Sequence, residues 1–168
     1  MISPDYVLTM ARYNRWQNRS LYAAAGGLTA GAREEDRGAF FGSIRGTFSH
    51  LLWGDTIWMS RFDGWSPPDV GIPSSAAWES DWDRLASARR DADDRIIEWA
   101  GEVSEDELAG KLAWFSGALG RDVERPMALC VMHFFNHQTH HRGQVHAMLT
   151  AAGAKPEDTD LFIMPDDA

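Results

Sequence analysis

The segment PMALCVMHFFNHQTHHRGQVHAMLTAA, residues 126–152, carries the strongest fold signal in this sequence of 168 residues. Pro126 stands at its start, and proline is favoured in the first turn of a helix because its missing N–H has no partner there anyway. Gly153 follows its end, where glycine commonly terminates a helix. The segment therefore predicts a long helix that ends near Ala152.

Three further helices are predicted towards the N-terminus, over Asp5–Ala25, Gly38–Phe62 and Ser75–Ala100. Their apolar residues recur at helical spacing, and Ser74 or Ser75 can cap the third. The proline-containing segment 65–75 is predicted to be a loop. Residues 108–125 contain several glycines between apolar residues and predict a short β-hairpin or an ordered loop. Four long helices in one domain, residues 1–168, indicate an all-α fold, a four-helix bundle.

Composition excludes several classes of protein. Formal net charge is −9, and no cluster of Lys and Arg forms a basic patch, which argues against nucleic acid and anionic membrane as partners. The single cysteine, Cys130, cannot form an internal disulfide. The N-terminus does not resemble a secretory signal, and no apolar run is long enough to span a bilayer. We therefore expect a cytoplasmic protein.

Five of the six histidines lie between residues 133 and 146. With His137 as reference, His133 and His141 lie about 40° to either side on a helix, His140 lies about 60° away, and His146 faces the opposite side. His133, His137 and His141 span about 12 Å along the helix axis, whereas zinc–nitrogen bonds are about 2 Å long. This helix can therefore give one ion an i, i+4 pair, either His133 with His137 or His137 with His141.

The remaining histidine, His50, lies on the second predicted helix. Its neighbours in angle, Gly46, Trp53, Gly54 and Ile57, are apolar or small, so His50 is expected to point into the bundle. Metal sites in helical bundles are built from facing helices. A lone histidine on an apolar face is more often a core residue, and clustered histidines can form a solvated or pH-sensitive face. A three-histidine site that includes His50 is the sharper of these hypotheses.

Three stretches together resemble a known family. HFFNHQTHHRGQ, residues 133–144, closely resembles the final-helix motif of the DinB family, to which metal-dependent activity is ascribed. FSHLLWGD, residues 48–55, resembles its second-helix motif, and YNRWQN, residues 13–18, its first-helix signature. The resemblance covers nearly the whole chain in order and spacing.

The resemblance implies a bundle with long crossovers in up-down-down-up order, with a homodimer as the common assembly. It also implies that the metal ligands are His50, His137 and His141, which makes His133 a neighbour of the site. One divalent ion is expected as the cofactor. Zinc suits three imidazoles best, and nickel and iron are chemically acceptable.

Several nearby residues receive predicted roles. Asn136, Gln144, Thr47 and Asp55 are candidates to orient a ligand histidine, and the helical angle favours Gln144. Gly143 is interpreted either as a point of close helix approach or as a tolerated helix glycine. We predict an ion pair for Arg142, a buried unreactive thiol for Cys130, and docking of the apolar run 161–164 on the body of the protein. The candidate pocket residues are Trp53, Trp58, Trp65 and Trp114.

Function follows from what an open three-histidine site can do. Relatives of this fold include thiol transferases, so the first hypothesis is a metal-dependent enzyme that activates a low-molecular-weight thiol for transfer to an electrophile in detoxification or stress response. The alternatives are a metal-dependent hydrolase that uses metal-activated water, an iron oxygenase, and a metal-binding stress-response protein without catalysis. The absence of a Glu between the helix histidines weakens the hydrolase hypothesis. The candidate base for a hydrolase is Asp55 or a loop carboxylate. The sequence assigns no general acid or base.

Overall fold

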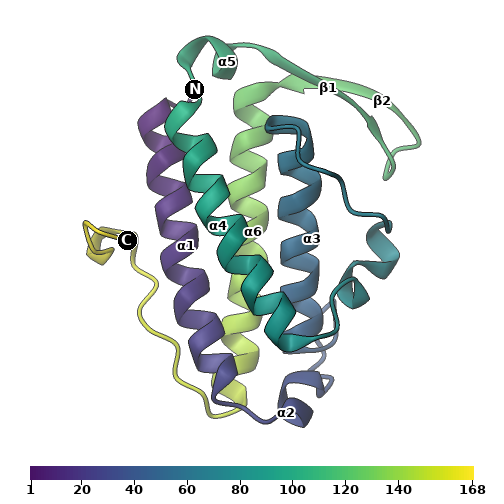
Figure 1. The fold of residues 1–168 in the computed structure, drawn as a ribbon, viewed down its shortest axis with the longest axis vertical. Helices are drawn as coiled ribbons and strands as arrows, with labels where there is room; N and C mark the ends of the chain where they lie inside the picture. Colours follow the sequence, from purple (N-terminus) through teal and green to yellow (C-terminus); the bar gives the residue numbers. More distant parts are fainter.

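Four long helices dominate the computed structural model, which describes residues 1–168 (Figure 1). They are α1 (Pro4–Gly26), α3 (Ile44–Phe62), α4 (Trp82–Glu102) and α6 (Met127–Ala151). The predicted all-α fold is therefore confirmed, and Pro126 directly precedes the helix that it was predicted to start. No helix is both long and apolar enough to cross a membrane.

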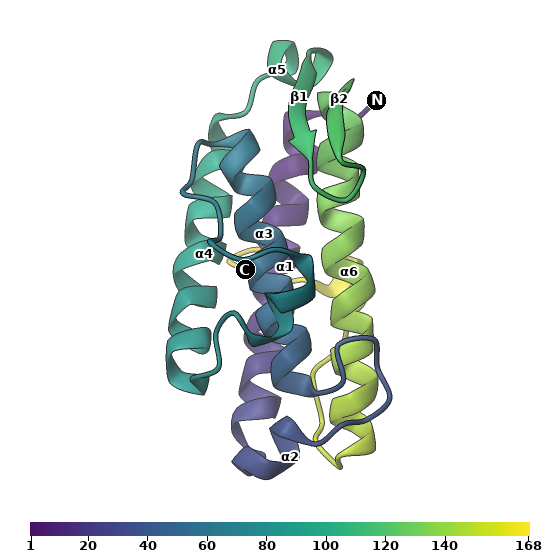
Figure 2. The same ribbon diagram turned by 90° about the vertical axis from the view of Figure 1, so that its right-hand side faces the viewer.

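The helices run in the predicted up-down-down-up order. Figures 1 and 2 show α1 and α6 running one way and α3 and α4 the other. Helices α1 and α3 each pack against both α4 and α6. Because α3 and α4 are parallel, residues 63–81 must return along the length of the bundle, and this long crossover forms a wall beside α3.

Two helices begin later than predicted. The second begins at Ile44 rather than Gly38, because the Ser43 side chain accepts a hydrogen bond from the Gly46 N–H and caps it there. The chain before it turns at Gly38 and Gly42, which have positive φ angles of 74° and 72°. The short helix α2 (Ala30–Glu34) precedes this turn and was not predicted.

Helix α4 begins at Trp82 rather than Ser75, and Asp81 caps it by accepting from the Arg84 N–H. The predicted caps Ser74 and Ser75 lie instead in a 3-10 helix, η1 (Ile72–Ala77). Helical spacing of the apolar residues did not separate a 3-10 turn from an α-helix, because both place residues i and i+3 on nearly the same side. This error moved Ser75 away from its actual position beside His50.

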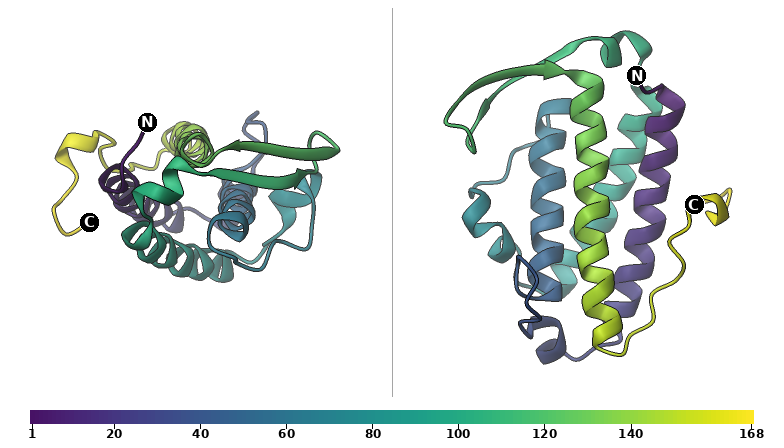
Figure 3. Two further views of the ribbon diagram at one scale, coloured as in Figure 1. Left: turned by 90° about the horizontal axis from the view of Figure 1, so that it is seen from above. Right: turned by 180° about the vertical axis from the view of Figure 1, so that it is seen from behind.

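The hairpin between the third and fourth long helices is confirmed. Strand β1 (Lys111–Ser116) pairs antiparallel with β2 (Arg121–Pro126), with Trp114 opposite Val123. The short helix α5 (Glu105–Ala109), which was not predicted, leads into it and is held by a capping box. Seen from above in Figure 3, the hairpin reaches from α6 out past α3, which brings its tip over the crossover.

A cluster of buried polar groups lies inside the bundle. The Arg89 guanidinium contacts Asp55 at 2.5 Å and Asp93 at 2.9 Å, and all three side chains are almost fully buried. Asn18 and Gln138 donate further hydrogen bonds to these carboxylates. Thus the ion pairs of the core belong to Arg89 on α4.

The predicted ion pair of Arg142 is wrong. Its guanidinium is buried and donates to Asn14 and Thr139, and it faces the Tyr13 ring, but it has no carboxylate partner. The carboxylates that could have paired with it are already held by Arg89.

The C-terminal tail docks differently from the prediction. Leu161, Phe162 and Ile163 form a short 3-10 helix, η2 (Leu161–Ile163), whose side chains remain exposed. The tail is held before this point, by hydrogen bonds from Tyr13 and Gln17 to the carbonyls of residues 159 and 158 and from the residue 157 N–H to Ser20. Polar contacts with α1, rather than the apolar run, therefore fix the tail.

Candidate metal centre

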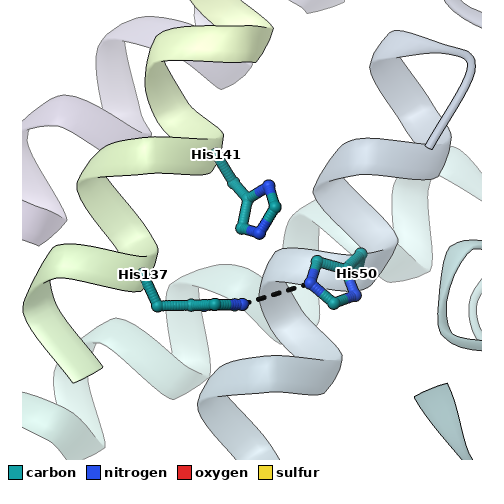
Figure 4. A group of neighbouring side chains, drawn as sticks. All are labelled: His50, His137 and His141. Atoms are coloured by element: carbon teal, nitrogen blue, oxygen red, sulfur yellow. Dashed lines mark hydrogen bonds between the residues drawn. The ribbon is translucent and has the colours of Figure 1, made fainter. Parts of the chain in front are cut away.

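The structure brings three histidines together between two antiparallel helices. His50 projects from α3, and His137 and His141 project from successive turns of α6 (Figure 4). One potential ligand nitrogen from each lies within 4.8 Å of the other two. The His50 Nε2 and His137 Nε2 atoms are 3.2 Å apart. His133, four residues before His137, is exposed and does not belong to this group.

Hydrogen bonds fix the orientation of His50. Its Nδ1 lies 2.8 Å from the Ser75 hydroxyl oxygen, and that hydroxyl lies 2.7 Å from the Ile72 carbonyl. The hydroxyl has one proton, which it donates to the carbonyl, so it accepts from the His50 Nδ1–H. The lone pair of His50 is then on Nε2, which faces the other two histidines. Its ring also stacks on Phe41, with the ring centroids 3.7 Å apart.

His141 is oriented in the same way. Its Nδ1 lies 2.7 Å from the Gln144 Oε1, so the Nδ1–H donates and Nε2 carries the lone pair. This confirms the predicted contact of Gln144. The other candidates form no hydrogen bond with a histidine of the cluster: Asn136 is exposed, the Thr47 hydroxyl donates to the Ser43 carbonyl, and Asp55 binds Arg89 and Gln138.

The cluster favours neutral imidazoles. Burial and, to a smaller extent, the nearby His141 together lower the pKa of His50 and of His137 to about 3 in each case. Burial also lowers the pKa of His141, partly opposed by its bond to Gln144. Neutral imidazole is the form that binds a metal ion, so these nitrogens do not need to lose a proton near neutral pH.

The spacing fits a divalent ion. Two nitrogens bound at about 2.1 Å in tetrahedral geometry lie roughly 3.4 Å apart, close to the 3.2 Å between His50 Nε2 and His137 Nε2. The Nδ1 of His137 is buried without a hydrogen-bond partner, so the one polar contact of this ring is that of its Nε2 with His50. These three histidines could hold a metal ion.

Gly54 creates the space that His137 occupies. A Cβ atom added at Gly54 would lie 2.7 Å from the His137 Cε1, closer than carbon atoms approach in proteins. Gly143 has the opposite surroundings, because an added Cβ would meet nothing within 4 Å. Of the two interpretations of Gly143, the tolerated helix glycine is therefore confirmed, and the close approach occurs at Gly54 instead. Its signal was available, since Gly54 lies one helical turn after His50.

We expect Gly54→Ala to destabilise the protein by about 1–3 kcal/mol, because the His137 ring must leave its position to accept the methyl group. Gly143→Ala is the matched control and should be neutral or stabilising by up to about 1 kcal/mol, because alanine favours an exposed helix. Urea unfolding of the metal-free proteins measures both changes. Equal effects of the two substitutions would contradict the role of Gly54.

A pocket of about 750 Å³ opens beside the histidines. His50 and His137 form one end of its lining, whereas His141 does not border it. Three of the four predicted pocket tryptophans line it, namely Trp53, Trp58 and Trp114. The fourth, Trp65, is buried in the core. The remaining walls come from the crossover at residues 70–73 and the hairpin tip at residues 115–118.

Cys130 on α6 is buried, as predicted, and burial raises the pKa of its thiol. A raised pKa keeps the thiol protonated, so Cys130 is not a nucleophile of this pocket.

Comparisons with known proteins agree with this architecture. The chain is 23% identical over 162 residues to Protein DinB of Bacillus subtilis (strain 168), covering 95% of this chain and 94% of that protein. A crystal structure of a DinB-like protein from Bacillus cereus ATCC 10987 superposes with a TM-score of 0.62 at 17% identity, covering 85% of this chain and 90% of the other. The sequence profile of the DinB family matches residues 1–167. The chain therefore belongs to the DinB family.

Proposed function

We propose that this protein binds one divalent metal ion through His50, His137 and His141, and that it activates a low-molecular-weight thiol for transfer to an electrophile. The observation that carries the proposal is the junction of the histidine cluster with the pocket, because His50 and His137 belong to both. Zinc is the expected ion, with nickel or iron as chemically acceptable substitutes. A homodimer is part of the proposal.

The donor set supports a reactive rather than a structural ion. Three imidazoles would leave a position open, whereas structural zinc sites are closed by four protein ligands. When bound, the ion would lower the pKa of a thiol and so supply a nucleophile at neutral pH. The protein would contribute fixed imidazoles and a pocket whose tryptophans exclude water around the reacting groups.

The lining of the pocket favours a thiol over water as the nucleophile. Hydrolysis needs a general base near the attacking water. No Asp or Glu lines the pocket, which leaves His133, outside the three-histidine cluster, as the one base in its lining. Asp55, the carboxylate proposed for that role, is buried and paired with Arg89. A thiol needs no base once its pKa has been lowered, so thiol transfer does not require a general base among the pocket residues.

The test uses the protein loaded with zinc or with cobalt. With glutathione, bacillithiol or mycothiol and a generic electrophile, we expect conjugation that is faster with the zinc-loaded than with the metal-free protein. The cobalt-loaded protein should show a thiolate-to-cobalt charge-transfer absorption when the active thiol is added. Stoichiometric metal without thiol turnover and without this absorption would contradict the transferase and leave a metal-binding protein without catalysis.

A further inference from the structure

One face of α3 links the histidine cluster to a cationic side chain. Gly54, Ile57 and Arg61 follow His50 by four, seven and eleven residues, and all line the pocket. Eleven residues correspond to about 16 Å of helix and return to nearly the same angle. Helical side chains lean towards the N-terminus, which brings the Arg61 guanidinium back towards His50. The pocket is therefore elongated, with His50 and His137 at one end. Arg61 lies towards the other end, where His133 packs against the same Trp58 ring.

The Arg61 guanidinium has no anionic partner within the protein. It makes no hydrogen bond or ion pair, and its central carbon lies 4.5 Å from the Trp58 ring centroid and 5.2 Å from that of Trp114. The side chain is only partly exposed. By contrast, the buried Arg89 contacts two carboxylates. A cation that packs against two neighbouring aromatic rings, in a pocket without acidic residues, is available to receive an anion from outside.

We propose that Arg61 binds a carboxylate of the ligand, at the end of the pocket remote from the histidines. The proposal rests on the proposed function for the position of the thiol. A single guanidinium matches the single charge of a carboxylate, and its planar fork can bind both oxygens. The tryptophan walls would cover the apolar part of the ligand between its two ends. Allowing for the reach of the arginine side chain, the thiol and carboxylate would be separated by roughly 10 Å, the length of an extended tripeptide.

Three probes of matched length test this assignment on the zinc-loaded protein. They are ω-mercaptooctanoate, ω-mercaptooctanol and octanoate, with octyl phosphate added to distinguish the type of anion. We expect the mercapto acid to bind at least about tenfold more tightly than the mercapto alcohol in calorimetric titrations, as one charge-assisted hydrogen bond would provide. Arg61→Gln should abolish this preference without changing the affinity for the alcohol or the zinc content, and Arg61→Lys should retain part of it.

Arg95→Gln is the matched control, because Arg95 also covers a tryptophan, Trp65 at 3.8 Å, but lies outside the pocket. It should leave the preference unchanged. Equal binding of mercapto acid and alcohol, or a preference that survives Arg61→Gln, would overturn the assignment while leaving the thiol function intact. Octanoate that binds as tightly as the mercapto acid, in an Arg61-dependent way, would support Arg61 and refute the thiol. Tighter binding of octyl phosphate than of octanoate would overturn the choice of carboxylate.

Discussion

His50→Ala, His137→Ala and His141→Ala are each expected to lose stoichiometric zinc. A four-ligand zinc site contributes about 10–16 kcal/mol in total, so one imidazole corresponds to about 3 kcal/mol, or at least a hundredfold in affinity. Elemental analysis of the purified variants and competition with a chromogenic chelator measure the loss. The substitutions should leave the helical content unchanged, because the core of the bundle lies outside the cluster.

Two histidines of the same helix provide controls for these variants. His133→Ala removes a side chain that lines the pocket and precedes His137 by one turn, but lies outside the cluster. His146→Ala removes a histidine that belongs neither to the pocket lining nor to the three-histidine cluster. Both proteins should retain full zinc. Loss of zinc from His133→Ala with retention in His141→Ala would mean that the other i, i+4 pair binds the metal.

Arg89→Met is expected to lower the free energy of unfolding by about 3–5 kcal/mol, the usual cost of removing one partner from a buried charge cluster. The substitution keeps an unbranched apolar side chain but leaves Asp55 and Asp93 buried without their ion-pair partner. Burial already raises the pKa of Asp93 to about 6, with Arg89 opposing that rise. Without Arg89 the pKa should rise further, so the folded protein should take up protons near neutral pH. Urea unfolding at several pH values measures both effects.

Arg84→Met is the matched control for Arg89→Met. Arg84 lies on the same helix and pairs with Glu79 at 3.0 Å, but its side chain is 70% exposed. Solvent screens such a pair, so the expected loss is much smaller than that of Arg89→Met. Similar losses in the two variants would show that the buried cluster contributes no more than a surface ion pair.

The sequence by itself determined the features that depend on local interactions. Apolar residues at helical spacing identified the long helices, and Pro126 and Gly153 marked the two ends of the last one. Both signals are local, because hydrogen bonds within a helix join residues four apart. The same regularity showed that one helix offers an ion only two of its histidines. The hairpin could also be predicted, because its strands are neighbours in the chain. Where caps and short turns set the start of a helix, as at Ile44 and Trp82, the pattern of apolar residues placed that start several residues too early.

Only the tertiary structure decided which side chains meet across helices. Helical spacing left His133 and His141 equivalent as partners of His137, and only the family resemblance chose between them. In the structure α3 places His50 beside His141 and Trp58 beside His133. The same packing leaves Gly54, rather than Gly143, without room for a side chain. It also places the buried carboxylates beside Arg89 instead of Arg142. The pocket that joins the histidines to Arg61 has walls from α3, α6, the crossover and the hairpin. Contacts between such distant segments depend on how whole helices pack, which no local pattern of residues encodes.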